Sequence, residues 1–93
     1  MRTRGPALRI RWRYTERISI PPAWRRWFWD HPEGTVPLEK LTLRVVQFGD
    51  YEAIHEVYAM NPDAFRDVVQ RHHRDVPRGV FFWIRVWDRV RSG

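Results

Sequence analysis

Three interruptions divide the second half of this 93-residue chain into short segments, and they constrain the fold more than any other feature. They are Gly49-Asp50, Asn61-Pro62-Asp63 and the stretch that starts at Asp75. Glycine can end a helix by taking the left-handed conformation, and Asp or Asn can accept hydrogen bonds from the free N–H groups of a first turn. Proline fits the first helical position. Each interruption therefore predicts the end of one helix and the start of the next.

Between these interruptions, apolar residues recur at spacings of three and four, which places them on one face of each predicted helix. We expect helices over about 37–48, 50–60 and 62–72. Their stripes are Leu38, Leu41, Val45 and Phe48; Ala53, Ile54, Val57 and Tyr58; and Phe65, Val68, Val69 and His72. A shorter helix is expected over 22–29, because Pro21-Pro22 can open it and aromatic residues follow at helical spacing. Residues 30–34 are expected to form a loop.

The last predicted helix starts at Val76 or Pro77, with Asp75 as its cap, and ends near Arg89. It is apolar on nearly all sides, through Val80, Phe81, Phe82, Trp83, Ile84, Val86 and Trp87. Helices of this kind are usually buried. The sequence thus predicts an all-α fold: a compact bundle of four to five short helices around a buried C-terminal helix, with a basic extended N-terminal arm. Residues 1–20 form the arm, extended or disordered, and residues 21–91 form the helical domain.

The positive charge of the chain is concentrated in and just after the arm. Residues 1–26 hold eight Arg and one Glu, whereas residues 27–93 hold nine basic and ten acidic groups. From Leu8 to Tyr14, apolar residues alternate with Arg, as in a strand, and Ile18 and Ile20 continue the same phase. No partner strand is evident elsewhere in the sequence. The segment would therefore pair with a second copy in a homodimer, add to the sheet of another protein, or stay extended.

The arm also suits binding to DNA or RNA, because arginines neutralise phosphates. The candidate residues for nucleic-acid binding are Arg9, Arg11, Trp12 and Arg13. A solvated tail, or upstream sequence joined by a misplaced start codon, would have the same composition.

Standard catalytic and metal-binding patterns are missing from the sequence. There is no cysteine, which excludes disulfides and thiolate ligands and fits a reducing compartment. The two serines, Ser19 and Ser92, lie in no nucleophile elbow, and the four histidines lack the spacing of a zinc site. No apolar run is long enough to span a bilayer. We therefore expect a cytoplasmic protein that is not an enzyme and that has no cofactor, no metal and no membrane contact.

Two features favour a surface for a protein partner. The segment 24–29 contains more large aromatic side chains than a short helix can bury on one face, so an exposed remainder is expected beside those that pack in the core. Residues 50–67 hold five acids and one Arg, which is either a solvated face or a complement to a basic partner. The candidate partner-binding residues are Trp24, Trp27, Trp29, Asp50, Glu52 and Glu56.

Three motifs add a resemblance. Residues 22–30 (PAWRRWFWD), residues 45–54 (VVQFGDYEAI) and Phe82-Trp83 resemble the Phe-Trp-Asp, Val-x-x-(Tyr/Phe)-Gly-Asp and closing Phe-Trp elements of a family of small bacterial proteins. The likeness covers about residues 20–88. It departs from the family pattern at 60–62, where members have Tyr-Gly, and at 75–79, where they have a basic turn with Ser or Thr.

Members of this family are often encoded beside AbiEii-type nucleotidyltransferase toxins. The resemblance implies an antitoxin-like accessory protein that binds and neutralises a cognate nucleotidyltransferase toxin. The acidic segment 50–67 would then complement the basic surface expected of such a transferase. The alternative is a small nucleic-acid-binding or transcription-regulatory protein that uses the Arg-rich arm.

Overall fold

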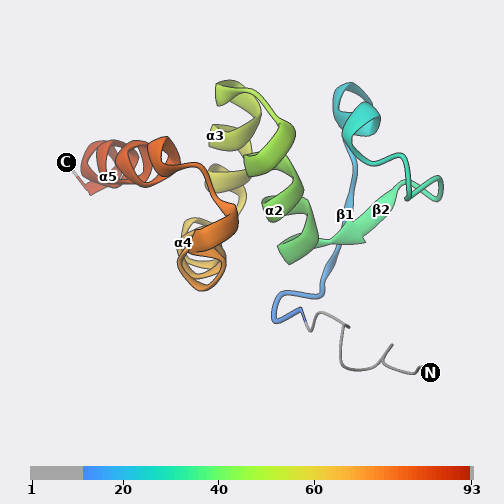
Figure 1. Ribbon diagram of the computed structural model, residues 1–93, viewed down its shortest axis with the longest axis horizontal. Coiled ribbons are helices and arrows are strands. Elements are labelled where there is room, and N and C mark those ends of the chain that lie inside the picture. Colours follow the sequence, from blue (N-terminus) through green and yellow to red (C-terminus); the bar gives the residue numbers. More distant parts are fainter. Residues whose placement is uncertain (1–11, 93) are drawn as a thin grey trace.

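A computed structural model describes residues 12–92 and shows a mostly helical body with one two-stranded sheet (Figure 1). In chain order the elements are β1 (Arg17–Ser19), the 3-10 helix η1 (Pro22–Trp27), β2 (Thr35–Pro37), α2 (Leu38–Phe48), α3 (Tyr51–Met60), α4 (Pro62–Arg71), the 3-10 helix η2 (His73–Asp75) and α5 (Arg78–Ser92). The helical character of the body is confirmed. The prediction of an all-α fold is wrong, because β1 and β2 pair antiparallel.

The strand in the N-terminal segment pairs within its own chain. Ile18 lies opposite Val36, and the extended chain continues alongside the start of α2. There the Leu38 N–H donates to the Glu16 carbonyl, and the next N–H along the chain donates to the Tyr14 carbonyl, both at 3.0 Å. The prediction that this segment lacks a partner in the sequence is therefore wrong for residues 17–19. Residues 8–11 of the predicted strand lie outside the described residues, so pairing of that part with a second copy or with another protein's sheet stays a prediction.

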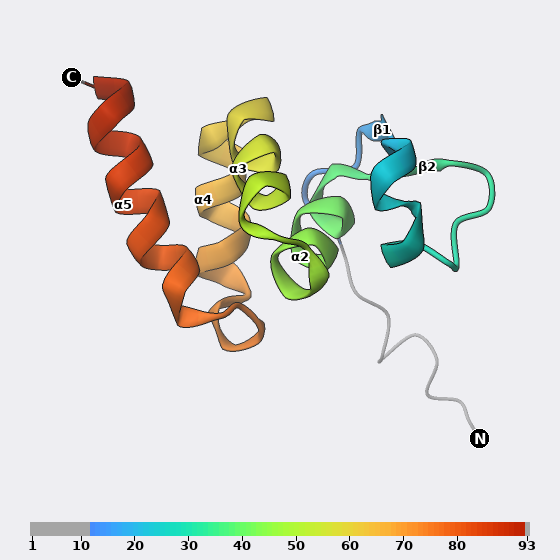
Figure 2. The same ribbon diagram turned by 90° about the horizontal axis from the view of Figure 1, so that it is seen from above.

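The C-terminal helix is not at the centre of the molecule. That place belongs to α2, which contacts α3, α4, η1 and both strands, and whose Leu41 and Val45 are fully buried. Helix α5 lies at one end, opposite η1 and the sheet (Figure 1, Figure 2). Its buried residues are Val80, Ile84 and Trp87, whereas Phe82, Val86 and Val90 are exposed. The prediction of a buried central α5 is therefore wrong: the helix is amphipathic and packs with one face.

Side-chain caps fix the starts of the two middle helices, as predicted. The Asp50 carboxylate accepts a hydrogen bond from the Ala53 N–H at 2.9 Å. The Asn61 side-chain oxygen accepts one from the Ala64 N–H at 3.1 Å. Each bond satisfies a donor that the first helical turn leaves free. None of the helices within residues 12–92 is long and apolar enough to cross a membrane.

Three helix boundaries differ from those that the sequence predicts. Gly49 ends α2 in an extended conformation, with φ −82° and ψ 171°, rather than a left-handed one. Glycine is needed there for space, since a Cβ atom would lie 2.7 Å from the Val45 carbonyl oxygen. Asp75 belongs to η2 and does not open the last helix, which begins at Arg78. The helix expected over 22–29 is a 3-10 helix over 22–27.

Candidate functional site

The structure separates the aromatic residues of segment 24–29 into core and surface. Trp24 and Trp27 are 5% and 9% exposed, and their rings pack against each other with centroids 6.2 Å apart. Phe28 is also buried. Trp29 is 68% exposed. Of the three tryptophans expected to bind a partner, only Trp29 is therefore available on the surface.

Trp29 is held in place from two sides. Its ring meets the ring of Phe48, which is 54% exposed, edge to face at 6.2 Å. The Arg44 guanidinium lies over the Trp29 ring at 4.8 Å, an attractive cation–π arrangement. Arg44 in turn donates to the Trp27 carbonyl at 2.7 Å and to Asp30 at 3.0 Å. The exposed ring therefore sits on a fixed support rather than on a loose loop.

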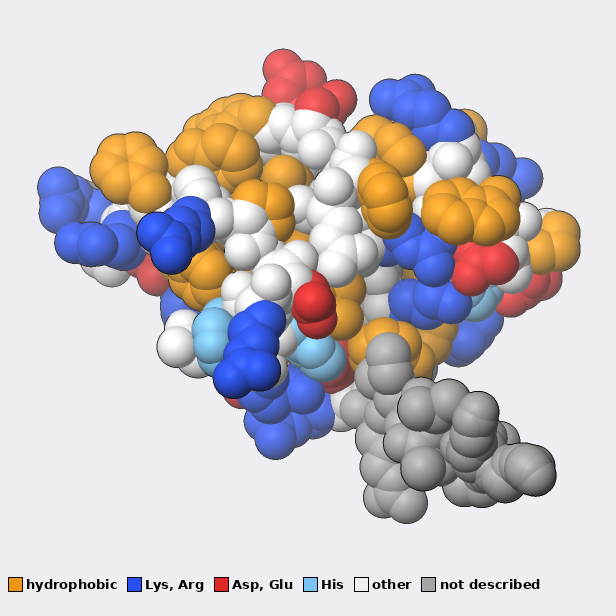
Figure 3. All heavy atoms as spheres, viewed as in Figure 1, with side chains coloured by type: hydrophobic (Ala, Val, Ile, Leu, Met, Phe, Trp, Pro, Cys, Tyr) orange, Lys and Arg blue, Asp and Glu red, His pale blue; other side chains and the backbone are white. Residues whose placement is uncertain are grey.

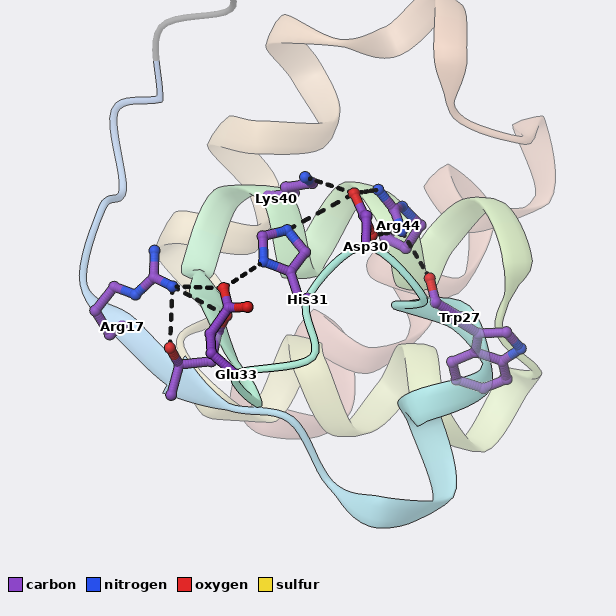
Figure 4. A network of polar contacts seen from close by, with 8 residues as sticks. Arg17, Trp27, Asp30, His31, Glu33, Lys40 and Arg44 are labelled. Carbon is purple, nitrogen blue, oxygen red and sulfur yellow. Dashed lines mark hydrogen bonds and ion pairs between the residues drawn. The ribbon is translucent and has the colours of Figure 1, made fainter.

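The loop that follows Trp29 is tied to α2 and β1 by ion pairs (Figure 4). Asp30 accepts hydrogen bonds from Arg44 and Lys40, and these contacts, the one from Arg44 above all, hold the pKa of the Asp30 carboxyl well below its usual range. Glu33 pairs with Arg17 of β1 at 3.6 Å. The predicted loop is confirmed, and this network makes it an ordered one.

A second aromatic pair lies beyond the Gly49–Asp50 turn. Tyr51 is 49% exposed and meets the ring of Trp83 on α5 edge to face at 5.0 Å. The Tyr51 hydroxyl accepts a hydrogen bond from the Trp87 indole at 3.0 Å. Figure 3 shows hydrophobic side chains on both sides of the α2–α3 turn. We call Trp29, Phe48, Tyr51 and Trp83 the aromatic ridge.

Acidic residues of α3 border this ridge. Glu52 and Glu56 are exposed, and neither forms an ion pair within residues 12–92. Asp50 is exposed as well, but its carboxylate is occupied as the cap of α3. The structure thus places Trp29, Asp50 and Glu52 at or beside the α2–α3 turn, Glu56 in the middle of α3, and Trp24 and Trp27 in the core.

The other two acids of segment 50–67, Asp63 and Asp67, form ion pairs with arginines of the same chain. Asp63 pairs with Arg66 one helical turn away. Asp67 pairs with Arg13 at 2.8 Å and with Arg71 at 3.2 Å. The acidic face expected from the sequence is therefore reduced to the glutamates of α3.

The arm residues expected to bind nucleic acid are partly accounted for. Arg9 and Arg11 lie outside the described residues. Trp12 is half-buried beside the His72 ring, with centroids 6.4 Å apart. The Arg13 guanidinium already pairs with a carboxylate of α4. Of the two candidate nucleic-acid-binding residues in the described part of the arm, Trp12 is uncharged and Arg13 is already paired with a carboxylate.

A buried carboxylate that the sequence analysis did not single out anchors the arm. Glu39 on α2 is fully buried and accepts hydrogen bonds from the backbone N–H groups of Arg13 and Tyr14, at 2.6 and 3.2 Å. Arg71 and His72 donate to it from the end of α4, at 2.9 and 2.8 Å. Burial raises the pKa of Glu39, but these donors outweigh it and lower the pKa to about 2. The four donors satisfy the buried carboxylate, so the cluster ties the arm and the end of α4 to α2.

The position of Glu39 in the sequence indicates that its side chain lies on the inward face of α2. It precedes Thr42 and Val46 by three and seven residues, and both are buried, so the spacing alone places it on an inward face of α2. A charge on such a face needs partners, and those partners come from distant segments.

Comparison of the chain with protein-family models, with curated proteins and with solved structures found no match. Among residues 12–92, no group of three His, Asp or Glu side chains is placed to hold a metal ion. The assignment of a function therefore depends on the surface itself and on the motifs of the sequence.

Proposed function

We propose that the protein is a non-catalytic binding protein that docks a partner protein on the aromatic ridge. The observation that carries the proposal is the exposure of three large rings before and after the α2–α3 turn, 68% for Trp29, 54% for Phe48 and 49% for Tyr51. Aromatic residues dominate the energetics of protein interfaces, because each buries a large area at little cost in conformational entropy. Rings that are held by Arg44 and by α5 lose still less freedom on binding.

The border of the ridge suggests the charge of the partner. Glu52, next to Tyr51, and Glu56, one helical turn further along α3, are exposed and form no ion pair within residues 12–92. A basic surface would be attracted to this border and oriented by it. A surface that binds nucleotides or RNA is basic, because it contacts phosphates.

The resemblance noted in the sequence supplies a specific partner. In our proposal the protein is an antitoxin-like accessory protein, and its ridge binds a cognate nucleotidyltransferase toxin and covers part of the basic substrate site. Neutralisation of this kind needs a rigid surface and no catalytic group of its own. The exposed residues of the Trp-Asp and Phe-Gly-Asp motifs, Trp29 and Phe48, are the same residues that form one end of the ridge.

Coexpression with a candidate AbiEii-type nucleotidyltransferase from the same genomic neighbourhood tests this proposal. We expect the two proteins to copurify and the growth arrest caused by the transferase to be relieved. The double variant Trp29→Ser/Phe48→Ser should lose both effects, because it removes the exposed anchors without touching the core.

Val90→Ser is the matched control, since Val90 is 74% exposed but lies on α5 away from the ridge. It should behave like the wild type. Absence of association between the wild-type proteins would refute the proposal. Equal losses in the ridge variant and the control would refute the assignment to the ridge.

A further inference from the structure

The outer face of α5 carries three arginines with no partner. Arg78, Arg85 and Arg89 are exposed, and none of them forms an ion pair within residues 12–92. Their spacing of seven and four residues places them on one side of the helix, over a length of about 16 Å. This line of charge is distinct from the arm, and it lies at the opposite end of the molecule from η1 (Figure 2).

An exposed ring lies within this line. Phe82 is 64% exposed and follows Arg78 by four residues and precedes Arg85 by three, so all three share one face. No packing of the described core requires a phenyl ring there. The face therefore combines positive charge with a flat apolar surface.

The single acid of α5 does not offset this charge. Asp88 points inward and accepts hydrogen bonds from the Tyr58 hydroxyl at 2.5 Å and from Arg66 at 2.8 Å. The fourth arginine of the helix, Arg91, donates to the same Tyr58 hydroxyl at 3.1 Å. The charged side chains of α5 thus form two groups. Asp88 and Arg91 have partners on the body, whereas Arg78, Arg85 and Arg89 face solvent.

We propose that this face binds single-stranded nucleic acid. Arg78, Arg85 and Arg89 would contact successive phosphates, and Phe82 would stack on an unpaired base between them. Phosphate contacts together with aromatic stacking are the two elements from which single-strand binding sites are built. RNA and DNA share both features, so the experiment has to separate them.

A second copy of the chain fits this face poorly. Pairing α5 with α5 through Phe82 would bring the arginines of the two copies together, which like-charge repulsion opposes. An anionic membrane surface or an acidic protein would satisfy the charges but gives no role to a solitary ring among them. Binding to an anionic membrane surface is kept as an outcome of the test.

Fluorescence anisotropy of the full chain with labelled oligonucleotides of about 20 residues tests the proposal directly. Single-stranded RNA, single-stranded DNA and a duplex of the same sequence are compared, and phosphatidylserine vesicles are added in a separate sedimentation assay. Two variants that each remove two positive charges are measured: Arg85→Ser/Arg89→Ser on α5, and Arg25→Ser/Arg26→Ser on η1. Circular dichroism verifies that each variant is folded.

We expect the α5 variant to bind single strands about tenfold or more weakly and to lower the slope of log affinity against log salt by about 1.4. The η1 variant should change affinity less than about twofold, which excludes a general charge effect. Phe82→Ala should weaken single-strand binding about fivefold or more and leave duplex binding unchanged. If Arg85→Ser/Arg89→Ser does not fold, Arg78→Ser takes its place.

Three results would overturn the proposal. They are the absence of oligonucleotide binding at moderate salt, equal losses in the two charge-matched variants, and binding to vesicles alone. Preference for RNA or for DNA identifies the strand without changing the assignment of the face. Because Arg85 and Arg89 lie on the outer face of α5 and are not part of the ridge, the α5 variant should still copurify with the protein partner, so each proposal can fail without the other.

Discussion

At the scale of single residues, the carboxylate of Glu39 joins segments that are far apart in the chain. It accepts hydrogen bonds from the backbone of Arg13 in the arm and from Arg71 at the end of α4, while belonging to α2 itself. A buried charge costs free energy unless it is fully paired. The net effect of this one residue is to hold the first described segment against the helical body.

Replacing Glu39 by Gln should therefore lower the free energy of unfolding by about 2–4 kcal/mol, because Arg71 and two backbone donors lose an ionised acceptor. Urea denaturation measures the change. Glu56→Gln is the control, since Glu56 is exposed and has no ion pair within residues 12–92. Similar stabilities for both variants would show that the buried cluster does not anchor the arm.

A second residue-scale prediction concerns the tight turn between α2 and α3. In Gly49→Ala, the new Cβ would meet the Val45 carbonyl oxygen at 2.7 Å and a ring carbon of Trp27 at 3.3 Å. The clash should cost about 1–3 kcal/mol. Gly79→Ala is the matched change, because its Cβ would meet only Trp83, at 3.9 Å, within a helix that alanine favours. Calorimetry should show a lower Tm for the first variant and an equal or higher Tm for the second.

At the scale of elements, α5 shows the limit of counting apolar residues. Eight of its residues are large and apolar, and this composition predicted a helix that is buried on all sides. The structure buries only the line through Val80, Ile84 and Trp87, and leaves Phe82 and Val86 outside. The flanking arginines at 78, 85 and 89 mark that outer side, and giving their positions more weight would have identified the amphipathic face.

Two valines on α5 test this placement. Val80 is fully buried and Val90 is 74% exposed. Val80→Ala should lower the free energy of unfolding by about 2 kcal/mol, and Val90→Ala should change it by less than about 0.5 kcal/mol. Chemical denaturation of both variants provides the measurement. Large losses in both would restore the prediction of a helix buried on every side.

The two helix caps could be predicted from the local sequence, whereas the pairing of the two strands could not. Asp50 and Asn61 act within three residues of their own positions, so the sequence specified both helix starts. The pairing of Ile18 with Val36 spans a loop and a 3-10 helix, and β2 has three residues that end in proline. So short a segment shows no alternation, and nothing local reveals that it is a strand.

At the scale of the whole molecule, the ion pairs predict a loss of stability in acid. The pKa of Glu39 falls from 4.5 to about 2 on folding, and the pKa values of Asp30 and Asp67 are lowered as well. A lowered pKa means that the ionised form stabilises the fold. The contribution is complete above the unfolded pKa and is lost as the pH falls through the folded one.

For Glu39 alone, the shift from 4.5 to about 2 corresponds to about 3 kcal/mol, lost between about pH 4.5 and pH 2. Urea denaturation across this range should show falling stability for the wild type and a flatter profile for Glu39→Gln. A wild-type free energy of unfolding that is constant or rises on acidification would contradict the arrangement of these carboxylates.

The candidate surface was only partly visible in the sequence. Trp24, Trp27 and Trp29 are the same residue type within one short segment, so the sequence does not distinguish them. Only tertiary packing decides that the first two lie in the core and the third on the surface. In the same way, Asp67 and Glu56 are similar acids on neighbouring helices, yet Asp67 pairs with Arg71 on its own helix and with Arg13, 54 residues away, whereas Glu56 has no ion pair within residues 12–92. Long-range pairing of this kind leaves the glutamates of α3 as the charged border of the ridge.

Hydrogen–deuterium exchange on the complex with the copurified transferase tests the central claim most directly. If the aromatic ridge is the docking surface, backbone amides at 28–30 and 48–56 gain protection on binding, and those at 85–92 on α5 exchange as in the free protein. Protection confined to α5, or none anywhere in residues 12–92, would contradict the account.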